Sequence, residues 1–140
     1  MIECRTMAGA ERFDAFALMK RFREESAVGD ALALFVDRPD YGFVWLAYDD
    51  GIPAGCVSVS FAISSETGGL AACLRDLWVV EDRRRHGIGS ALLATLRGRL
   101  DQLSVSQIEA VIPPDAALQA FFASLNYAAC EAARVTFRSR

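Results

Sequence analysis

The chain has 140 residues, of which 53% are hydrophobic and 24% are charged, and its formal net charge is −3 at pH 7. This length predicts a single domain over residues 1–140 with a sizeable apolar core. The acidic balance argues against nucleic acid as a partner, because nucleic-acid-binding domains usually carry a basic excess. No apolar run approaches the roughly 18–20 residues of a membrane span, so no membrane partner is expected either.

The N-terminal half predicts a strand, two helices and a hairpin. Residues 2–6 suit a short strand, and apolar residues at helical spacing predict a helix over 7–25. A second short helix is expected over 29–36. Within 43–63, Asp50-Gly51 separates two β-rich runs and is a strong hairpin-turn signal.

The C-terminal half alternates strands and helices. We expect a strand over 71–80, a helix over 89–103, a strand over 106–112, a helix over 116–125, and one or two strands over 127–138. Together with the first half, this order predicts an α/β layered domain.

The cysteines and the single histidine, His86, give no metal-site pattern. The four cysteines are far apart and form no CxxC pair, so no metal cofactor is expected. Free thiols are typical of a reducing cytosol. Because the first residues also lack the apolar region of a signal peptide, a cytoplasmic location is expected.

Residues 84–90 read RRHGIGS and join an apolar run to a helical run. The first amides of a helix have no intrahelical partner and attract anions. Gly87 and Gly89 let a ligand approach the backbone, and Arg84 and Arg85 attract phosphate oxygens. Local chemistry alone leaves two interpretations open, a phosphate site or a strand-to-helix turn with a solvated basic surface. The spacing matches neither a nucleoside triphosphate loop nor a dinucleotide fingerprint.

The longer stretch LRDLWVVEDRRRHGIGSALL, residues 74–93, resembles the acetyl-CoA-binding motif of the GNAT family of N-acetyltransferases. Arg84, Gly87 and Gly89 fill the family's Arg/Gln, Gly and Gly/Ala positions. LQAFFASLNY, residues 118–127, resembles the family's late helix, so the resemblance covers essentially the whole chain. It implies a GNAT-like mixed, mostly antiparallel sheet of six or seven strands. About four helices would flank this sheet, which would be splayed between its fourth and fifth strands.

The resemblance also implies that acetyl-CoA is the cosubstrate. Backbone amides of residues 85–90 would hold the pyrophosphate, and the main chain of residues 77–79 would pair with the pantetheine arm as an added strand. An amide near Val79 would polarise the acetyl carbonyl. The coenzyme-binding residues implied are Leu77, Trp78, Val79, Arg84, Arg85, His86, Gly87, Ile88, Gly89 and Ser90.

Three further positions are implied at the reacting end. Asp76 is the candidate general base, taking an amine proton through water; the alternative is an aspartate paired with an arginine. Glu66 resembles an acidic position that faces the acceptor in one subgroup; the alternative is a solvated loop glutamate. Phe122 stands where the family often has its tyrosine acid, and we expect its ring at the thioester. Its helical spacing with Leu118 and Leu125 also suits a core residue.

The leading hypothesis is an N-acetyltransferase in which a primary amine, of a small molecule or a peptide, attacks acetyl-CoA directly. Acidic residues within 22–42 and at Glu66 favour a cationic amine. Two alternatives remain. One is an acyl-CoA-binding regulatory protein with weak or no transfer, supported by Phe122. The other is an interaction domain in which residues 84–90 are only a turn. An apolar C-terminal run, residues 133–138, suits pairing across a homodimer two-fold.

Overall fold

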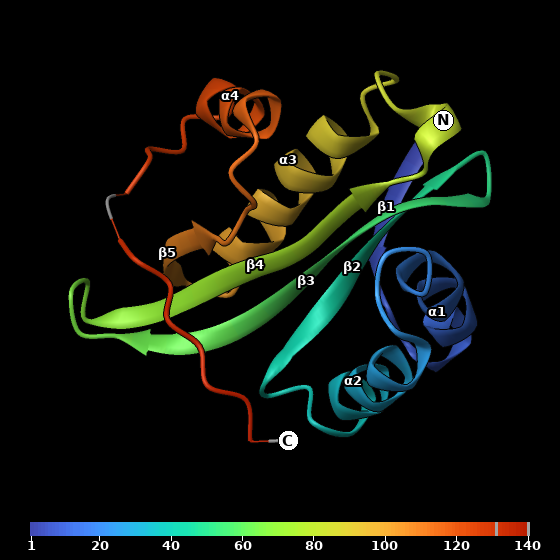
Figure 1. Ribbon diagram of the computed structural model, residues 1–140. Coiled ribbons are helices and arrows are strands. Elements are labelled where there is room, and N and C mark those ends of the chain that lie inside the picture. Colours follow the sequence, from blue (N-terminus) through green and yellow to red (C-terminus); the bar gives the residue numbers. More distant parts are fainter. Residues whose placement is uncertain (131, 140) are drawn as a thin grey trace.

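The computed structural model describes residues 1–130 and 132–139, and its five strands form one sheet (Figure 1). The strand order is β1 (Ile2–Thr6), β2 (Gly42–Asp49), β3 (Ile52–Ser64), β4 (Gly69–Val79) and β5 (Val105–Ala110). Neighbours from β1 to β4 are antiparallel, whereas β5 is parallel to β4. The sheet is therefore mixed and mostly antiparallel, as predicted.

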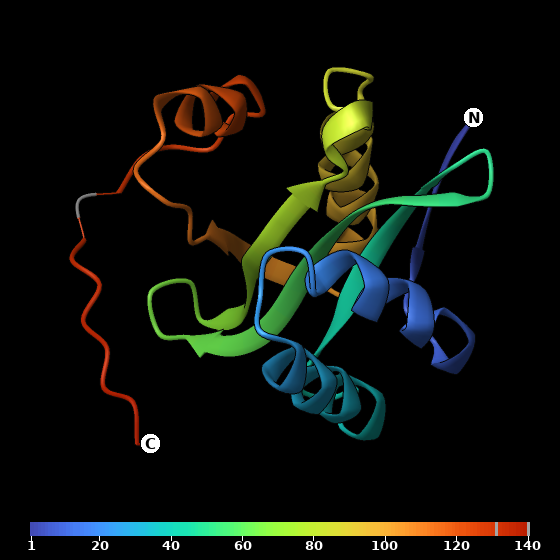
Figure 2. The ribbon, with the colours of Figure 1, turned by 45° about the vertical axis from the view of Figure 1, so that its right-hand side comes forward.

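Helices cover both faces of the sheet. One face packs against α1 (Arg12–Met19) and α2 (Glu25–Asp37), and the other against α3 (Ile88–Gln102) and α4 (Ala116–Ser124), as Figure 2 shows. Side chains along a strand alternate between faces, so β2 and β3 supply two cores. The α3 side takes Trp45, Ala47, Val57 and Val59, and the α1–α2 side takes Val44, Leu46, Tyr48 and Cys56.

The predicted hairpin is present, with β2 and β3 joined at Asp50-Gly51. Both residues have positive φ, 49° and 81° respectively. A two-residue turn with two positive φ angles matches the twist of the flanking strands, and aspartate followed by glycine is the pair that adopts it most readily.

The single helix expected over residues 7–25 was wrong in extent. A short 3-10 turn, η1 (Gly9–Glu11), precedes α1, and α1 ends at Met19. A new helix begins because the Glu24 carboxylate accepts hydrogen bonds from the amides of Ser26 and Ala27, as a helix cap does. The Ser26 hydroxyl and these amides also lower the pKa of Glu24. The α1–α2 turn, residues 20–24, contacts the C-terminal part of β4 through Phe22 on Trp78 and Arg23 on Asp76.

The sheet has five strands rather than the six or seven expected, because residues 128–130 and 132–139 form neither strand nor helix. A strand requires a partner for its backbone groups. After α4, however, the chain runs away from β5 (Figure 2). Val135 and Phe137 are 91% and 90% exposed. The prediction of C-terminal strands over 127–138 therefore fails in the described part of this segment.

The fourth and fifth strands separate as expected. Pairing between them ends at Leu74, whose carbonyl accepts from the amide of Val111 at 3.1 Å. β4 continues to Val79, and there it pairs only with β3, through Trp78 opposite Cys56 and Val79 opposite Gly55. The last five residues of β4 thus have an edge that β5 does not cover. No helix in the described residues is long and apolar enough to span a membrane.

Candidate coenzyme and acceptor site

The glycine turn links the free end of β4 to α3. A short 3-10 turn, η2 (Glu81–Arg83), follows β4, and α3 then begins at Ile88. Gly87 is the residue before the helix and has φ 81°, while Arg85 has φ 69°. Most side chains resist this left-handed region, and glycine does not. The backbone conformation therefore favours glycine at 87, independently of any ligand.

The amides of this turn are available to a ligand. The first hydrogen bond at the start of α3 runs from the amide of Ala91 to the carbonyl of Gly87. In the described part of the chain, none of the amides of residues 85–90 is paired with a protein acceptor. With the dipole of the 15-residue α3 behind them, they form the kind of site that binds phosphate. The backbone predicted to hold pyrophosphate thus has a suitable conformation.

Arg84 lies along β4 and does not point into the turn. Its Nε donates to the carbonyl of Val79 at 2.9 Å, at the strand end where β5 is absent. Arg85, His86 and Ser90 are exposed. The turn and the free strand edge, predicted as two parts of one coenzyme site, are therefore adjacent in the structure, and the Arg84 side chain contacts the strand edge.

Trp78 connects the coenzyme side to the α1–α2 turn. Its ring stacks on Phe22, with centroids 5.4 Å apart and an interplanar angle of 27°. The guanidinium carbons of Arg21 and Arg84 lie 5.3 and 5.7 Å from the Trp78 ring centroid. Guanidinium groups at this distance are attracted to the ring. One tryptophan thus contacts an arginine from each side of the site.

Asp76 occupies a bulge in β4. Ser58 pairs with Arg75 and Cys56 with Trp78, so Val57 faces two residues of β4. Asp76 has φ 57°, a conformation that aspartate tolerates better than most residues. The extra residue turns the carboxylate toward the α1–α2 turn, and its side chain is 18% exposed. The candidate base thus lies next to the free edge of β4.

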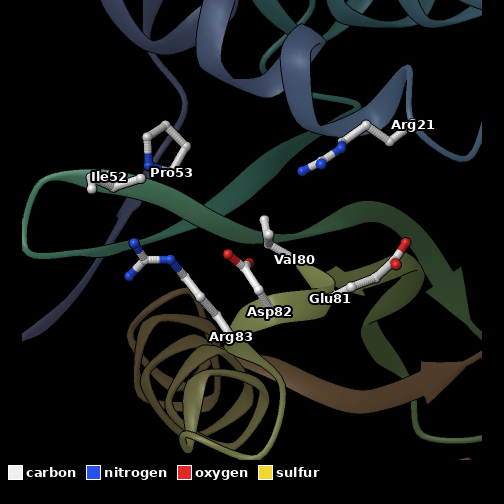
Figure 3. A pocket seen from close by; sticks show the side chains of 7 residues that line it. All are labelled: Arg21, Ile52, Pro53, Val80, Glu81, Asp82 and Arg83. Atoms are coloured by element: carbon white, nitrogen blue, oxygen red, sulfur yellow. The ribbon is translucent and has the colours of Figure 1, made fainter.

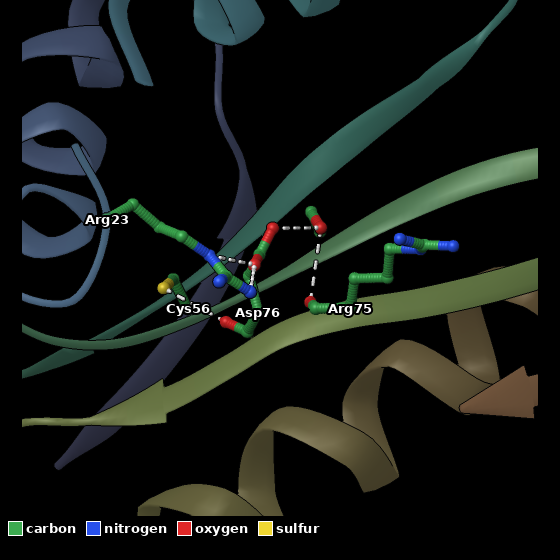
Figure 4. Close-up of polar contacts among 5 residues, drawn as sticks. Arg23, Cys56, Arg75 and Asp76 are labelled. Atoms are coloured by element: carbon green, nitrogen blue, oxygen red, sulfur yellow. Dashed lines mark hydrogen bonds and ion pairs between the residues drawn. The ribbon is translucent and has the colours of Figure 1, made fainter. Parts of the chain in front are cut away.

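Both oxygens of the Asp76 carboxylate have partners (Figure 4). Oδ1 accepts from Nε and Nη2 of Arg23 at 3.0 and 2.7 Å. The Ser58 hydroxyl lies 3.0 Å from Oδ2 and 3.1 Å from the carbonyl of Arg75. The sequence allowed an arginine partner for Asp76 but placed only Arg75 beside it. The arginine that binds is Arg23, 53 residues away.

Sequence reasoning missed Arg23 and Ser58. Ser58 is the one buried polar side chain in the described residues, 5% exposed. Val57 and Val59 face α3, and side chains alternate along β3, so Ser58 between them faces the α1–α2 side. This alternation is the only sequence signal for its position. For Arg23, the charged stretch that follows α1 resembles an ordinary solvated turn. Its role depends on a contact that no local pattern encodes.

Glu66 does not join this cluster. It is exposed, in the turn between β3 and β4. The strand from Gly69 to Asp76 spans about 23 Å at the usual rise per residue. The structure thus places Glu66 at the opposite end of β4 from the candidate base.

Phe122 lies in the hydrophobic core. It is 5% exposed, belongs to the cluster that contains Leu92 and Leu96, and packs edge-to-face on Phe121 and Tyr127. Phe121 lies nearer than Phe122 to the glycine turn. A Cβ atom added to Gly89 would be 3.4 Å from the Phe121 ring. The structure favours the core interpretation of Phe122 over our expectation of a ring at the thioester.

A hollow that the sequence did not predict lies beside the glycine turn (Figure 3). Its volume is about 450 Å³, and its walls come from the α1–α2 turn, the start of β3 and η2: Arg21, Ile52, Pro53, Val80, Glu81, Asp82 and Arg83. Arg83 also forms an ion pair with Asp49 at 2.7 Å. No group of metal-ligating side chains gathers among the described residues.

The fold and the turn identify the class of protein. The sequence model of the acetyltransferase (GNAT) family matches residues 10–127. The chain therefore belongs to the GNAT acetyltransferase family, as the motif in residues 74–93 indicated. No curated protein matches the chain in sequence.

Solved structures support the same fold. AAC(6')-Iy in complex with the bisubstrate analogue CoA-S-monomethyl-acetylneamine matches with a TM-score of 0.81 at 14% identity, over 100% of this chain and 99% of that chain. A ribosomal-protein-alanine N-acetyltransferase from Brucella melitensis matches with a TM-score of 0.80 at 18% identity, over 99% of each chain. An integron cassette protein from the mobile metagenome of Cole Harbour salt marsh matches with a TM-score of 0.84 at 20% identity, over 98% and 90%.

Proposed function

We propose that this chain, as a single domain, transfers the acetyl group of acetyl-CoA to a primary amine within a ternary complex. The observation that carries the proposal is the continuity of three features. Unpaired amides at residues 85–90 continue into the uncovered edge of β4, and Asp76 lies at the bulge where that edge begins. This arrangement suits a long ligand with an anionic end and a reactive end.

The chemistry needs few groups. The amine nitrogen forms a bond to the acetyl carbon, and the carbon–sulfur bond breaks with its electron pair on sulfur. The ammonium form of the acceptor first loses one proton to Asp76 through water, which gives the neutral amine that attacks. The nitrogen releases its second proton to solvent after the bond forms, and the thiolate takes a proton from solvent, since Phe122 has no hydroxyl. The main-chain amide of Val79 would polarise the carbonyl oxygen. Most of the rate enhancement would come from holding the amine against the thioester.

The acceptor is proposed to be a cationic amine of a small molecule or a peptide, because an aspartate is the acidic group at the site. Among the structural neighbours, one is a ribosomal-protein-alanine N-acetyltransferase, and another is in complex with the bisubstrate analogue CoA-S-monomethyl-acetylneamine. We place the reaction in the cytoplasm. The four cysteines are free in the structure, as in a reducing compartment.

A homodimer through the C-terminal run, residues 133–138, is also proposed. Val135 and Phe137 are almost fully exposed, and the outer edge of β5 has no strand partner in the described residues. If the C-terminal run of one copy paired with the β5 edge of another, the exposed side chains would be covered and the β5 edge would gain a strand partner. Light scattering should give the mass of a dimer, and removal of residues 133–140 should give a monomer.

A second candidate function is an acyl-CoA-binding regulatory protein with weak or no transfer. The burial of Phe122 and the Arg23–Asp76 ion pair favour it. Two measurements test these functions, and only the second separates them. Coenzyme A at 100 times its Kd should stabilise the fold by about 2.7 kcal/mol in both cases. Release of free thiol from acetyl-CoA across a panel of amines is expected only for the transferase.

A further inference from the structure

The Arg23–Asp76 contact joins one fixed group and one movable group. Asp76 is fixed by the β4 bulge, its side chain is 18% exposed, and the Ser58 hydroxyl contacts its second oxygen. Arg23 comes from the exposed α1–α2 turn, and its side chain is 58% exposed. An ion pair with so exposed a partner contributes little net free energy. A competing cation can therefore displace the arginine without disturbing the strand.

The surroundings of Arg23 suit an ammonium group. Asp76 offers a carboxylate oxygen with two donors already directed at it, 3.0 and 2.7 Å away. The guanidinium carbon of Arg23 also lies 5.6 Å from the centre of the Phe22 ring. A carboxylate beside an aromatic face is a general arrangement for binding organic cations. Arg21 and Arg84 already lie over the neighbouring Trp78 ring, so Phe22 is the aromatic face that Arg23 itself uses.

We propose that Arg23 occupies the ammonium subsite of the acceptor and is an internal competitor that a cationic amine must displace from Asp76. This inference rests on the proposed function, because it specifies how that site selects its acceptor. Arg23 then determines which acceptors bind. An amine occupies the subsite only if it interacts with Asp76 strongly enough to displace the guanidinium, so cations that interact weakly with Asp76 are excluded. The apparent Kd of the amine equals its intrinsic Kd divided by the fraction of molecules in which Arg23 has left the subsite.

The test is amine binding without turnover. With the protein saturated by coenzyme A, calorimetry would measure the Kd of 1,5-diaminopentane and of methylguanidinium. Arg23→Ala should bind both about tenfold more tightly than the unmodified chain. Arg23→Lys, which keeps a cation on the turn, should bind both close to the original affinity. The double variant Arg23→Ala with Asp76→Asn should lose the gain.

A matched control is Arg99→Gln, which removes one positive charge from α3, where Arg99 contacts Gln102. It should leave both affinities unchanged. Melting temperatures establish that each variant is folded. Unchanged or weaker binding in Arg23→Ala, or a gain that persists without the Asp76 charge, would overturn the inference.

The inference and the proposed function fail in different ways. If Arg23→Ala binds the diamine more tightly but neither protein releases thiol from acetyl-CoA, the subsite stands and the transferase proposal fails. If the unmodified chain acetylates the diamine while Arg23→Ala shows no gain in affinity, the transferase stands and the role of Arg23 is refuted.

Discussion

The proposed coenzyme side and the proposed acceptor side of the site are built in opposite ways. The coenzyme side is a short continuous segment, residues 77–90, in which backbone atoms are the expected ligands. The acceptor side joins side chains from three separate segments, Arg23, Ser58 and Asp76. A ligand held by backbone requires only a particular local conformation. A ligand held by side chains requires distant parts of the chain to meet.

This contrast predicts that the two sides can be damaged separately. Changes to the turn should remove coenzyme binding and leave the acceptor cluster intact, and changes to the cluster should do the reverse. Single substitutions on each side test whether that independence holds.

Gly87→Val should abolish measurable coenzyme A binding. The residue has φ 81°, a region that a β-branched residue strongly resists, so the turn must change shape. Gly98→Val is the matched control, because Gly98 lies within α3, which Gly87 precedes, with open space around it and no positive φ. Calorimetry on folded protein decides the result. Unchanged affinity in Gly87→Val would remove the main support for a backbone phosphate site.

Asp76→Asn should reduce the single-turnover rate of acetyl transfer by about 100-fold, as loss of a general base does, with coenzyme A affinity unchanged. Asparagine suits the left-handed backbone as well as aspartate does, so the bulge should persist. Asp101→Asn, on the exposed end of α3, is the control. A parallel loss of coenzyme affinity would show that the two sides are not independent.

Phe122→Tyr should lower the free energy of unfolding by about 1–3 kcal/mol, because the new hydroxyl would be buried without a partner. We expect no increase in the transfer rate. Thermal melting and single-turnover kinetics on the same protein measure both quantities. A faster enzyme with unchanged stability would instead place this ring at the thioester, where the family motif puts a tyrosine.

Arg84→Ala and Arg85→Ala should each weaken coenzyme A binding by about 1–2 kcal/mol, as loss of a charge-assisted contact does. The effect should shrink at high salt, since both side chains are exposed and exposed charges are screened. Arg99→Ala on α3 is the control. An effect of equal size at low and high salt would mean that these arginines act through packing.

Stability at alkaline pH is expected to depend on Cys56, whose Sγ donates to the carbonyl of Asp76 at 3.6 Å. Burial, and then the nearby Asp76 charge, raise the pKa of Cys56 from 9.0 to about 12. The folded state thus retains a proton that the unfolded state loses between these values, and stability should fall as pH rises from 9 to 12. Cys56→Ala should weaken this dependence in denaturant titrations, and an identical slope in both proteins would contradict the assignment.

Sequence patterns predicted the parts of this molecule that depend on local rules. The Asp50-Gly51 hairpin follows from turn geometry, and the splay of β4 from β5 followed from the motif in residues 74–93. The break between the two predicted helices was placed too late in the chain, because the Glu24 cap overrides an apolar spacing that continues through Phe22. The C-terminal strands were expected from composition, but strand formation depends on a partner edge that composition does not supply.

The candidate site also has one part that sequence patterns predict and one part that depends on packing between distant segments. The turn at residues 85–90 was recognisable because it belongs to a continuous motif, residues 74–93, in which Gly87 stands where the backbone has a positive φ. The orientation of Phe122 was not, since a helix presents both a slot face and a core face, and only packing decides between them. The pairing of Asp76 with Arg23 in place of Arg75 depends on a one-residue bulge, which reverses the direction of the side chain.

The left-handed backbone at Asp76 also limits which amino acids can occupy that position. Glycine, asparagine and aspartate adopt this conformation readily, whereas other residues incur roughly 1–2 kcal/mol. In a saturation library at position 76, many substitutions would therefore lower activity because they destabilise the strand. Only the substitutions that fold would report on the chemistry of the side chain. A glutamate variant would combine a longer carboxylate with a strained backbone, so its activity would not by itself report the reach of the acid. Mutational tolerance at this residue thus reflects strand shape as much as catalysis.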